Sequence, residues 1–296
     1  MNDYLRITST RGQLWCFFFL LIGGVVVASL IYSIVMNIAA PGHAAVDFTH
    51  PGSIVLLKFL QAVYTIFTFL IPAFFFSYFV YRDKPFMQLG FRKPATSNFY
   101  LLAVLLLLLS LPLGGWLGQL NHAIPLPSWM VHREKDADQE IVAFLKTGSF
   151  GGMLANIFLI AVIPAICEEA CFRGALQPIL IRSLKSPWAG IILTGIIFSA
   201  VHLQFQGFLP RMMLGILLGA VYWYSGSLWV SILAHFFTNA IQVVAVSYYP
   251  KFITEDPSVP VYEAIVSLGI VISLLILIKR QADAAMDTKV YAKENP

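Results

Sequence analysis

The sequence has little charge. Charged residues make up 11% of the 296 residues, whereas hydrophobic residues make up 58%, and the mean hydropathy is +0.78. So few polar side chains cannot cover the surface of a soluble globule of this length. The composition therefore excludes a soluble fold and predicts a chain solvated by lipid.

Cysteine is also scarce. The chain contains Cys16, Cys167 and Cys171, an odd set without CxxC spacing, and the last two lie four residues apart on one helical face. Unpaired cysteine usually behaves as a small hydrophobic residue. We predict that all three are buried apolar side chains.

Several common catalytic motifs are missing. The sequence contains no HExxH, no GxSxG, no intramembrane Asp pair and no phosphate-binding loop, so the usual zinc-protease spacing is absent. No internal repeat is evident either. The chemistry has to be sought in polar residues that fall inside apolar runs.

Long apolar runs dominate the chain. A membrane-spanning helix needs about 20 mostly apolar residues, because a helix satisfies its own backbone amides in the hydrocarbon core. The pattern predicts an all-α, polytopic transmembrane helix bundle of about eight spans. These spans are 14–40, 54–81, 100–120, 153–170, 188–205, 208–224, 228–249 and 262–278. The first is too long for a signal peptide and is followed by Pro41 and Gly42, so we expect it to be retained.

The basic residues indicate the orientation. Lys and Arg are enriched in cytoplasmic loops, and a start inside places 13 of them inside and five outside, with Lys58 within a span. The five outside are Arg133, Lys135, Lys146, Arg211 and Lys251; the inside set begins with Arg6 and Arg11 and ends with Lys289 and Lys293. Both termini are therefore predicted to be cytoplasmic. The net charge of +4 reflects this topology, and no nucleic-acid partner is expected.

Three parts are predicted along the chain. Residues 1–149 form an N-terminal scaffold of three spans, followed by a polar outer loop at 121–147. We expect that loop to be solvated, and a substrate gate is the alternative. Residues 150–249 form a catalytic core, because ionisable and amide side chains now enter the apolar runs, where they are costly. Residues 250–296 form the last span and a cytoplasmic tail.

The first polar constellation is a pair of glutamates at the end of an apolar run. Glu169 and Arg173 lie four residues apart on a helix and can pair, whereas Glu168 points about 100° away and lacks that partner. A carboxylate without a cation in low dielectric suits a general base. The alternative is that both glutamates lie in the headgroup region.

Two histidines stand in later runs. Phe198 precedes His202 by four residues, and His235 precedes Asn239 by four. If residues 185–187 form a turn between antiparallel helices, Glu168 and His202 lie at nearly the same height, about 25 Å from that turn. A lone membrane histidine is more often a hydrogen-bond partner between helices, but two histidines beside these glutamates favour a site.

These side chains suffice to hydrolyse an amide. A carboxylate and an imidazole can hold and deprotonate a water, while a second imidazole and an amide NH₂ can stabilise the oxyanion. The same set could instead bind zinc through Glu168, His202 and His235, with one position open for water. We favour the first reading, because Glu168 is then free to act as the base.

In order along the chain, EExxxR at 168–173, FxxxH at 198–202 and HxxxN at 235–239 resemble the CPBP family of intramembrane peptidases. That family includes the type II CAAX prenyl endopeptidases and the bacterial Abi relatives linked to bacteriocin processing or immunity. The resemblance covers roughly residues 150–245, and nothing outside the motifs indicates a prenylated substrate.

The resemblance implies roles for the motif residues. Activation of water would fall on Glu168 and His202, and stabilisation of the oxyanion on His235 and Asn239. The supporting residues would be Glu169, Arg173 and Phe198. The family is commonly described as metallopeptidases, which keeps zinc open as a cofactor, and the expected partners are the lipid bilayer and a peptide or protein substrate in or at the membrane.

Two other functions stay open at this point. A non-catalytic immunity or scaffold protein could keep the peptidase fold, because an intact motif set does not demonstrate catalysis. A transporter could use the same polar cluster as an ion site, although the paired broken helices of repeated halves are absent.

Overall fold

The fold is entirely helical where it is described. The computed structural model describes residues 7, 9–39, 51–145, 149–249 and 258–294, and these ranges contain helices and turns without a β-strand. The prediction of an all-α fold is confirmed. Predictions that fall on Arg6, Pro41, Gly42, Lys146 and Lys251 lie outside the described residues.

Six helical rods are long and apolar enough to cross a membrane. They are Thr10–Ala39, Gly52–Tyr81, Asn98–His122, Phe150–Leu184, Leu228–Tyr248 and Val261–Ala285. Many large apolar side chains on them are exposed, which is the surface that lipid solvates. The protein is therefore an integral membrane protein.

Two further apolar helices lie outside this set. Helix α11 (Pro187–Ala200) has 14 residues and is about 21 Å long, less than the roughly 30 Å of a hydrocarbon core. Helix α12 (Phe208–Ser225) has 18 residues. The predicted number of about eight spans is thus not confirmed, because six helices in the described part of the chain combine the length and the hydropathy of a span.

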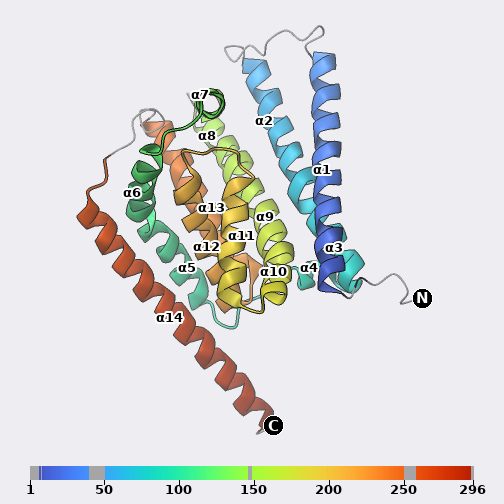
Figure 1. The fold of residues 1–296 in the computed structure, drawn as a ribbon, viewed down its shortest axis with the longest axis vertical. Helices are drawn as coiled ribbons and strands as arrows, with labels where there is room; N and C mark the ends of the chain where they lie inside the picture. The colour runs from blue at the N-terminus through green and yellow to red at the C-terminus, as the bar shows by residue number, and fades with distance from the viewer. Residues whose placement is uncertain (1–6, 8, 40–50, 146–148, 250–257, 295–296) are drawn as a thin grey trace.

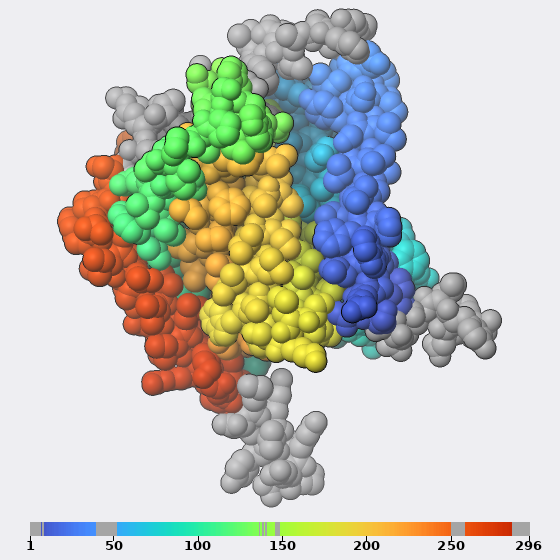
Figure 2. Space-filling view, viewed as in Figure 1, coloured from blue at the N-terminus to red at the C-terminus, as the bar shows by residue number. Residues whose placement is uncertain are grey.

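The helices form a central group flanked on two sides (Figure 1). One side consists of α1 (Thr10–Ala39) and of a second rod built from α2 (Pro51–Thr65), η2 (Ile66–Leu70) and α3 (Ile71–Tyr81). The short helix α4 (Pro85–Gln88) follows α3 in the chain. On the other stand α5 (Asn98–Leu109), α6 (Leu111–His122) and α14 (Val261–Glu294). The start of α1 and the end of α14 point to the same end of the molecule (Figure 1), and Figure 2 shows the coloured part of α14 on the opposite flank from α1.

The central group holds every residue of the three motifs. Its first rod runs through α8 (Phe150–Asn156), η3 (Ile157–Val162), α9 (Ile163–Glu169), η4 (Ala170–Leu176) and α10 (Gln177–Leu184). Helices α11, α12 and α13 (Leu228–Tyr248) pack beside it, and α7 (Ser128–Leu145) lies across its upper end (Figure 1).

Prolines explain why the long rods contain wide π-helical turns. Each of Pro72, Pro164 and Pro178 is the second residue of an α-helical segment that directly follows a π-helical one. A proline has no N–H for the carbonyl one turn earlier and its ring clashes with that carbonyl, so the preceding turn widens. Pro164 and Pro178 thus each accompany a local widening of the helix, one on either side of Glu168.

The tight turn predicted at residues 185–187 is confirmed. Helix α10 ends at Leu184, Lys185 adopts the left-handed conformation with φ of 51°, and α11 starts at Pro187. The Ser186 hydroxyl caps α11 by accepting a hydrogen bond from the Ala189 N–H at 3.3 Å. Helices α10 and α11 therefore run antiparallel and pack against each other.

The buried core is built around these helices. Cys167 and Cys171 are 2% and 0% exposed, while Cys16 is partly buried against the same apolar cluster. The prediction that the cysteines are buried apolar residues is confirmed for the two in α9 and η4. One intramembrane cation, Lys58, donates to Asn156 Oδ1 at 2.7 Å, so it is satisfied by the protein.

Candidate active site

Glu169, Arg173 and His235 form a buried polar cluster at the centre of the molecule. Arg173 donates from Nη1 to Glu169 Oε1 at 2.7 Å, and both side chains are 0% exposed. The same carboxylate oxygen lies 3.0 Å from His235 Nδ1. Because a carboxylate only accepts, His235 Nδ1 carries the proton and Nε2 is the ring atom left for other partners. The pairing of Glu169 with Arg173 is as predicted.

Arg173 also ties this cluster to two neighbouring helices. Its Nη2 donates to the Gly215 carbonyl of α12 at 3.0 Å, and its guanidinium carbon lies 4.5 Å from the centre of the Phe198 ring of α11. Cation–π contact and charge-assisted hydrogen bonding together fix the guanidinium. One buried arginine thus connects η4, α11 and α12.

Phe198 is the apolar centre of the site. Its ring stacks edge to face against His202, with centroids 5.1 Å apart, and against His235 at 6.0 Å. The His202 Nδ1 lies 2.7 Å from the Phe198 carbonyl. A carbonyl only accepts, so Nδ1 carries a proton and Nε2 is available as an acceptor. The two predicted motif histidines, one in α13 and one in the turn that follows α11, therefore share one aromatic neighbour.

Glu168 differs from its neighbour Glu169. It is buried, at 8% exposure, yet its carboxylate has no hydrogen bond or ion pair with any residue in the described ranges. Electrostatic interactions link it to His235, Arg173 and Arg211. The structure thus separates the two glutamates as expected from their angular offset, since Glu169 is engaged and Glu168 is left free beside the cluster.

Asn239 is the predicted site residue that is least connected. It lies one helical turn beyond His235 in α13 and is half-buried, and within the described part of the chain its side chain makes no hydrogen bond. The structure places it beside the histidine but does not join it to the other site residues.

The arrangement of the predicted zinc ligands does not favour zinc binding. Among the described residues, no group of three His, Cys, Asp or Glu side chains is arranged to hold a metal ion. Arg173 and Arg211 both interact with Glu168, and two fixed positive charges disfavour a divalent cation beside them. The set of Glu168, His202 and His235 therefore does not fit a zinc site in this arrangement, and no step below passes through a metal.

Two residues that support the site were not predicted from the sequence. Glu134 in α7 and Asn121 in α6 are 7% and 4% exposed, and both bind the turn at 201–207 that carries His202. The expectation of a solvated outer loop is thus wrong for Glu134. A signal existed, because Val131, Glu134 and Ala137 recur at three-residue spacing, and the structure leaves Glu134 buried and the other two partly buried.

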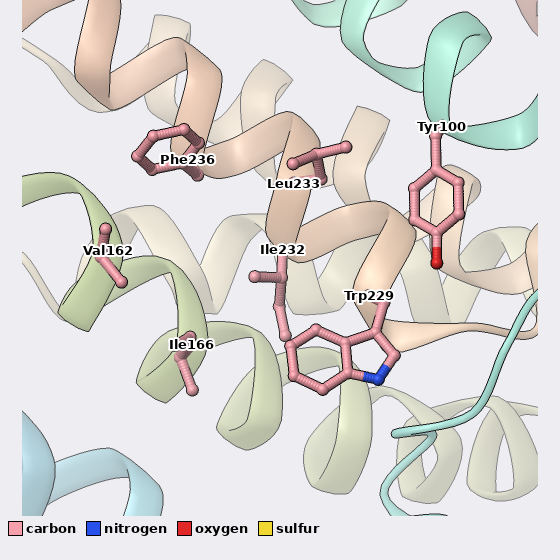
Figure 3. Close-up of a pocket in the computed structure, with 7 residues that line it drawn as sticks. All are labelled: Tyr100, Val162, Ile166, Trp229, Ile232, Leu233 and Phe236. Carbon is pink, nitrogen blue, oxygen red and sulfur yellow. The ribbon is translucent and has the colours of Figure 1, made fainter.

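An apolar pocket of about 370 Å³ lies elsewhere on the same helices (Figure 3). It is lined by Tyr100, Val162, Ile166, Trp229, Ile232, Leu233 and Phe236. The pocket contains no carboxylate or imidazole. It is therefore an apolar recess beside the polar cluster and takes no part in the acid–base chemistry.

The bundle has an apolar surface that faces lipid and a buried cluster of carboxylate, imidazole and guanidinium groups. These two features define an integral membrane protein with a polar site within its helices. Residues 150–241 match the family model described as type II CAAX prenyl endopeptidase Rce1-like. The match confirms the predicted CPBP assignment and shows an intramembrane protease domain of the CAAX type. Comparison with curated proteins and with solved structures gave no match.

Proposed function

We propose that this protein is an endopeptidase that hydrolyses a peptide bond in a membrane-embedded or membrane-associated substrate. The observation that carries the proposal is that the two adjacent glutamates have different partners. Glu169 binds Arg173 and His235, whereas Glu168 is buried without an ionic partner among the described residues. A carboxylate that no cation or donor holds is free to accept a proton from a water molecule.

In the proposed reaction, Glu168 removes a proton from a water molecule while His202 Nε2 accepts the second hydrogen bond from that water. The resulting hydroxide attacks the scissile carbonyl carbon, and the carbonyl oxygen becomes the oxyanion. Glu168 then delivers its proton to the leaving nitrogen as the C–N bond breaks, so that the base is regenerated.

His235 and Asn239 are proposed to stabilise the oxyanion. Donation of His235 Nδ1–H to Glu169 directs Nε2 away from that carboxylate, and in the doubly protonated ring Nε2–H is the donor for the oxyanion. The amide NH₂ of Asn239, one turn away, would be the second donor. Arg173 and Phe198 hold this arrangement in place without touching the substrate.

The activity is tested with purified protein in proteoliposomes and a fluorogenic library of membrane peptides. We expect wild type to cleave, and Glu168→Gln and His202→Ala each to lower turnover by about 10²-fold or more while the thermal unfolding profile stays unchanged. Glu263→Gln is the matched control, because Glu263 is an exposed carboxylate on α14.

The result that would overturn the assignment is full cleavage by either site variant. If no peptide is cleaved by wild type, and the Glu168→Gln and His202→Ala variants still support the protein's function in cells, the protein is instead a non-catalytic immunity or scaffold protein of the same fold.

We also propose that the protein resides in a bacterial cytoplasmic membrane with both termini inside. The excess of Lys and Arg assigned to the inside supports this orientation, as does the common direction of the start of α1 and the end of α14 (Figure 1). Labelling of a single cysteine placed at either end with a membrane-impermeant reagent in intact cells should fail, and labelling would contradict the orientation.

A further inference from the structure

The turn that carries His202 needs hydrogen-bond partners for its backbone. Because α11 is only about 21 Å long, the chain turns back through residues 201–207 below the upper ends of α1 and α2 (Figure 1). Buried backbone amides without a partner are costly. Leu203, directly after His202, has φ of 54°, a left-handed conformation that non-glycine residues adopt at a cost.

Helix α7 supplies the largest part of that support. The Glu134 carboxylate accepts from the amide of Phe205 in a short hydrogen bond and from the amide of Gln206 at 3.3 Å. Trp129, one and a half turns earlier in α7, packs edge to face on the Phe205 ring with centroids 5.6 Å apart. A buried carboxylate with two backbone donors is a strong clamp, since bonds to a charged acceptor are about twice as strong as neutral ones.

Helix α6 supports the same turn from another side. Asn121 Nδ2 donates to the Phe205 carbonyl at 2.7 Å, and its Oδ1 accepts from the Leu209 amide at 2.8 Å. The peptide groups on either side of Phe205 are thus held by two helices that lie outside the matched family segment. The turn in between can hold only one position while both clamps are made.

We propose that Glu134 is a positioning residue for His202. By fixing the amides of Phe205 and Gln206 it holds the turn that sets the height and direction of the His202 ring, three residues earlier. Helix α7 therefore acts as part of the site although it lies in a polar segment far from the three motifs. This inference rests on the proposed function for its effect on turnover, but the contact itself can be measured without any substrate.

The test compares wild type with Glu134→Ala, Glu134→Gln and the control Gln139→Ala, which changes an exposed residue of the same helix. Hydrogen exchange of the peptide covering residues 203–207 is followed by mass spectrometry. We expect Glu134→Ala to speed exchange of the Phe205 and Gln206 amides about tenfold or more, the factor for one lost charge-assisted hydrogen bond. Glu134→Gln keeps an acceptor and should restore most of the protection.

Two functional readouts accompany the exchange data. The rate at which diethyl pyrocarbonate modifies His202 should rise about tenfold in Glu134→Ala, and kcat for the peptide library should fall about tenfold with KM within twofold, both rescued largely by Glu134→Gln. Unchanged exchange would refute the clamp. Faster exchange with normal His202 reactivity and normal kcat would refute positioning. If wild type cleaves nothing, the proposed function fails, and the exchange and His202 reactivity still decide the positioning role.

Discussion

The strongest prediction concerns the buried pair of Glu169 and Arg173. Replacing Arg173 with Met removes a 2.7 Å bond to Glu169 and a 3.0 Å bond to the Gly215 carbonyl. It leaves a carboxylate at 0% exposure with only His235 as partner. Breaking a buried pair on one side costs about 3–5 kcal/mol, because the remaining charge is uncompensated. We expect a loss of that size in the free energy of unfolding.

The reverse substitution and the double variant make the reasoning testable. Glu169→Gln leaves Arg173 buried without a counter-charge and should also cost about 3–5 kcal/mol. In the double variant neither charge remains, so the loss should be smaller than the sum of the single losses by about 2 kcal/mol or more. Unfolding by sodium dodecyl sulfate in mixed micelles supplies all four free energies. Additive losses would show that the charges do not interact and would refute the argument.

Three further predictions concern the site and its scaffold. His235→Ala and Asn239→Ala should lower kcat by about 10²–10³-fold, and steady-state kinetics showing an unchanged turnover number for either would remove that residue from the oxyanion role. Treatment with a strong chelator should leave turnover unchanged, and metal analysis should find well under one ion per chain; loss of activity restored by zinc would reverse our preference for a metal-free reaction. Gly215→Val should lower the thermal midpoint clearly, because a Cβ at Gly215 would lie 2.9 Å from Gly195 Cα and force α11 and α12 apart; an unchanged midpoint would show that the close approach is dispensable.

Local spacing explains what the sequence could predict. The pairing of Glu169 with Arg173 and the separate direction of Glu168 follow from helical geometry over five residues, and the turn at 185–187 follows from a capping serine before a proline. These features need no knowledge of the rest of the chain. The all-helical fold follows equally directly from long apolar runs.

The missing parts depend on contacts between segments far apart in the chain. Glu134 lies 71 residues from Phe205, whose amide it binds, and no local pattern in the sequence predicts this pairing. The length of α11 could not be predicted either. The helix ends at Ala200, but Val201, Leu203 and Phe205 extend the apolar run in the sequence beyond that residue. The apolar run in the sequence is therefore longer than the helix that it forms.

The different engagement of the two adjacent glutamates has a consequence for related chains. Glu169 is bound into the packing of three helices, so a chain that lost it would have to lose Arg173 as well or unfold. Glu168 has no such bond, and a chain could replace it while keeping the same architecture. If Glu168 is the base, as proposed, an EExxxR segment reduced to xExxxR would mark a folded member without peptidase activity, whereas ExxxxR would mark a chain that no longer builds this core. Loss of the first glutamate would then report on activity, and loss of the second on stability.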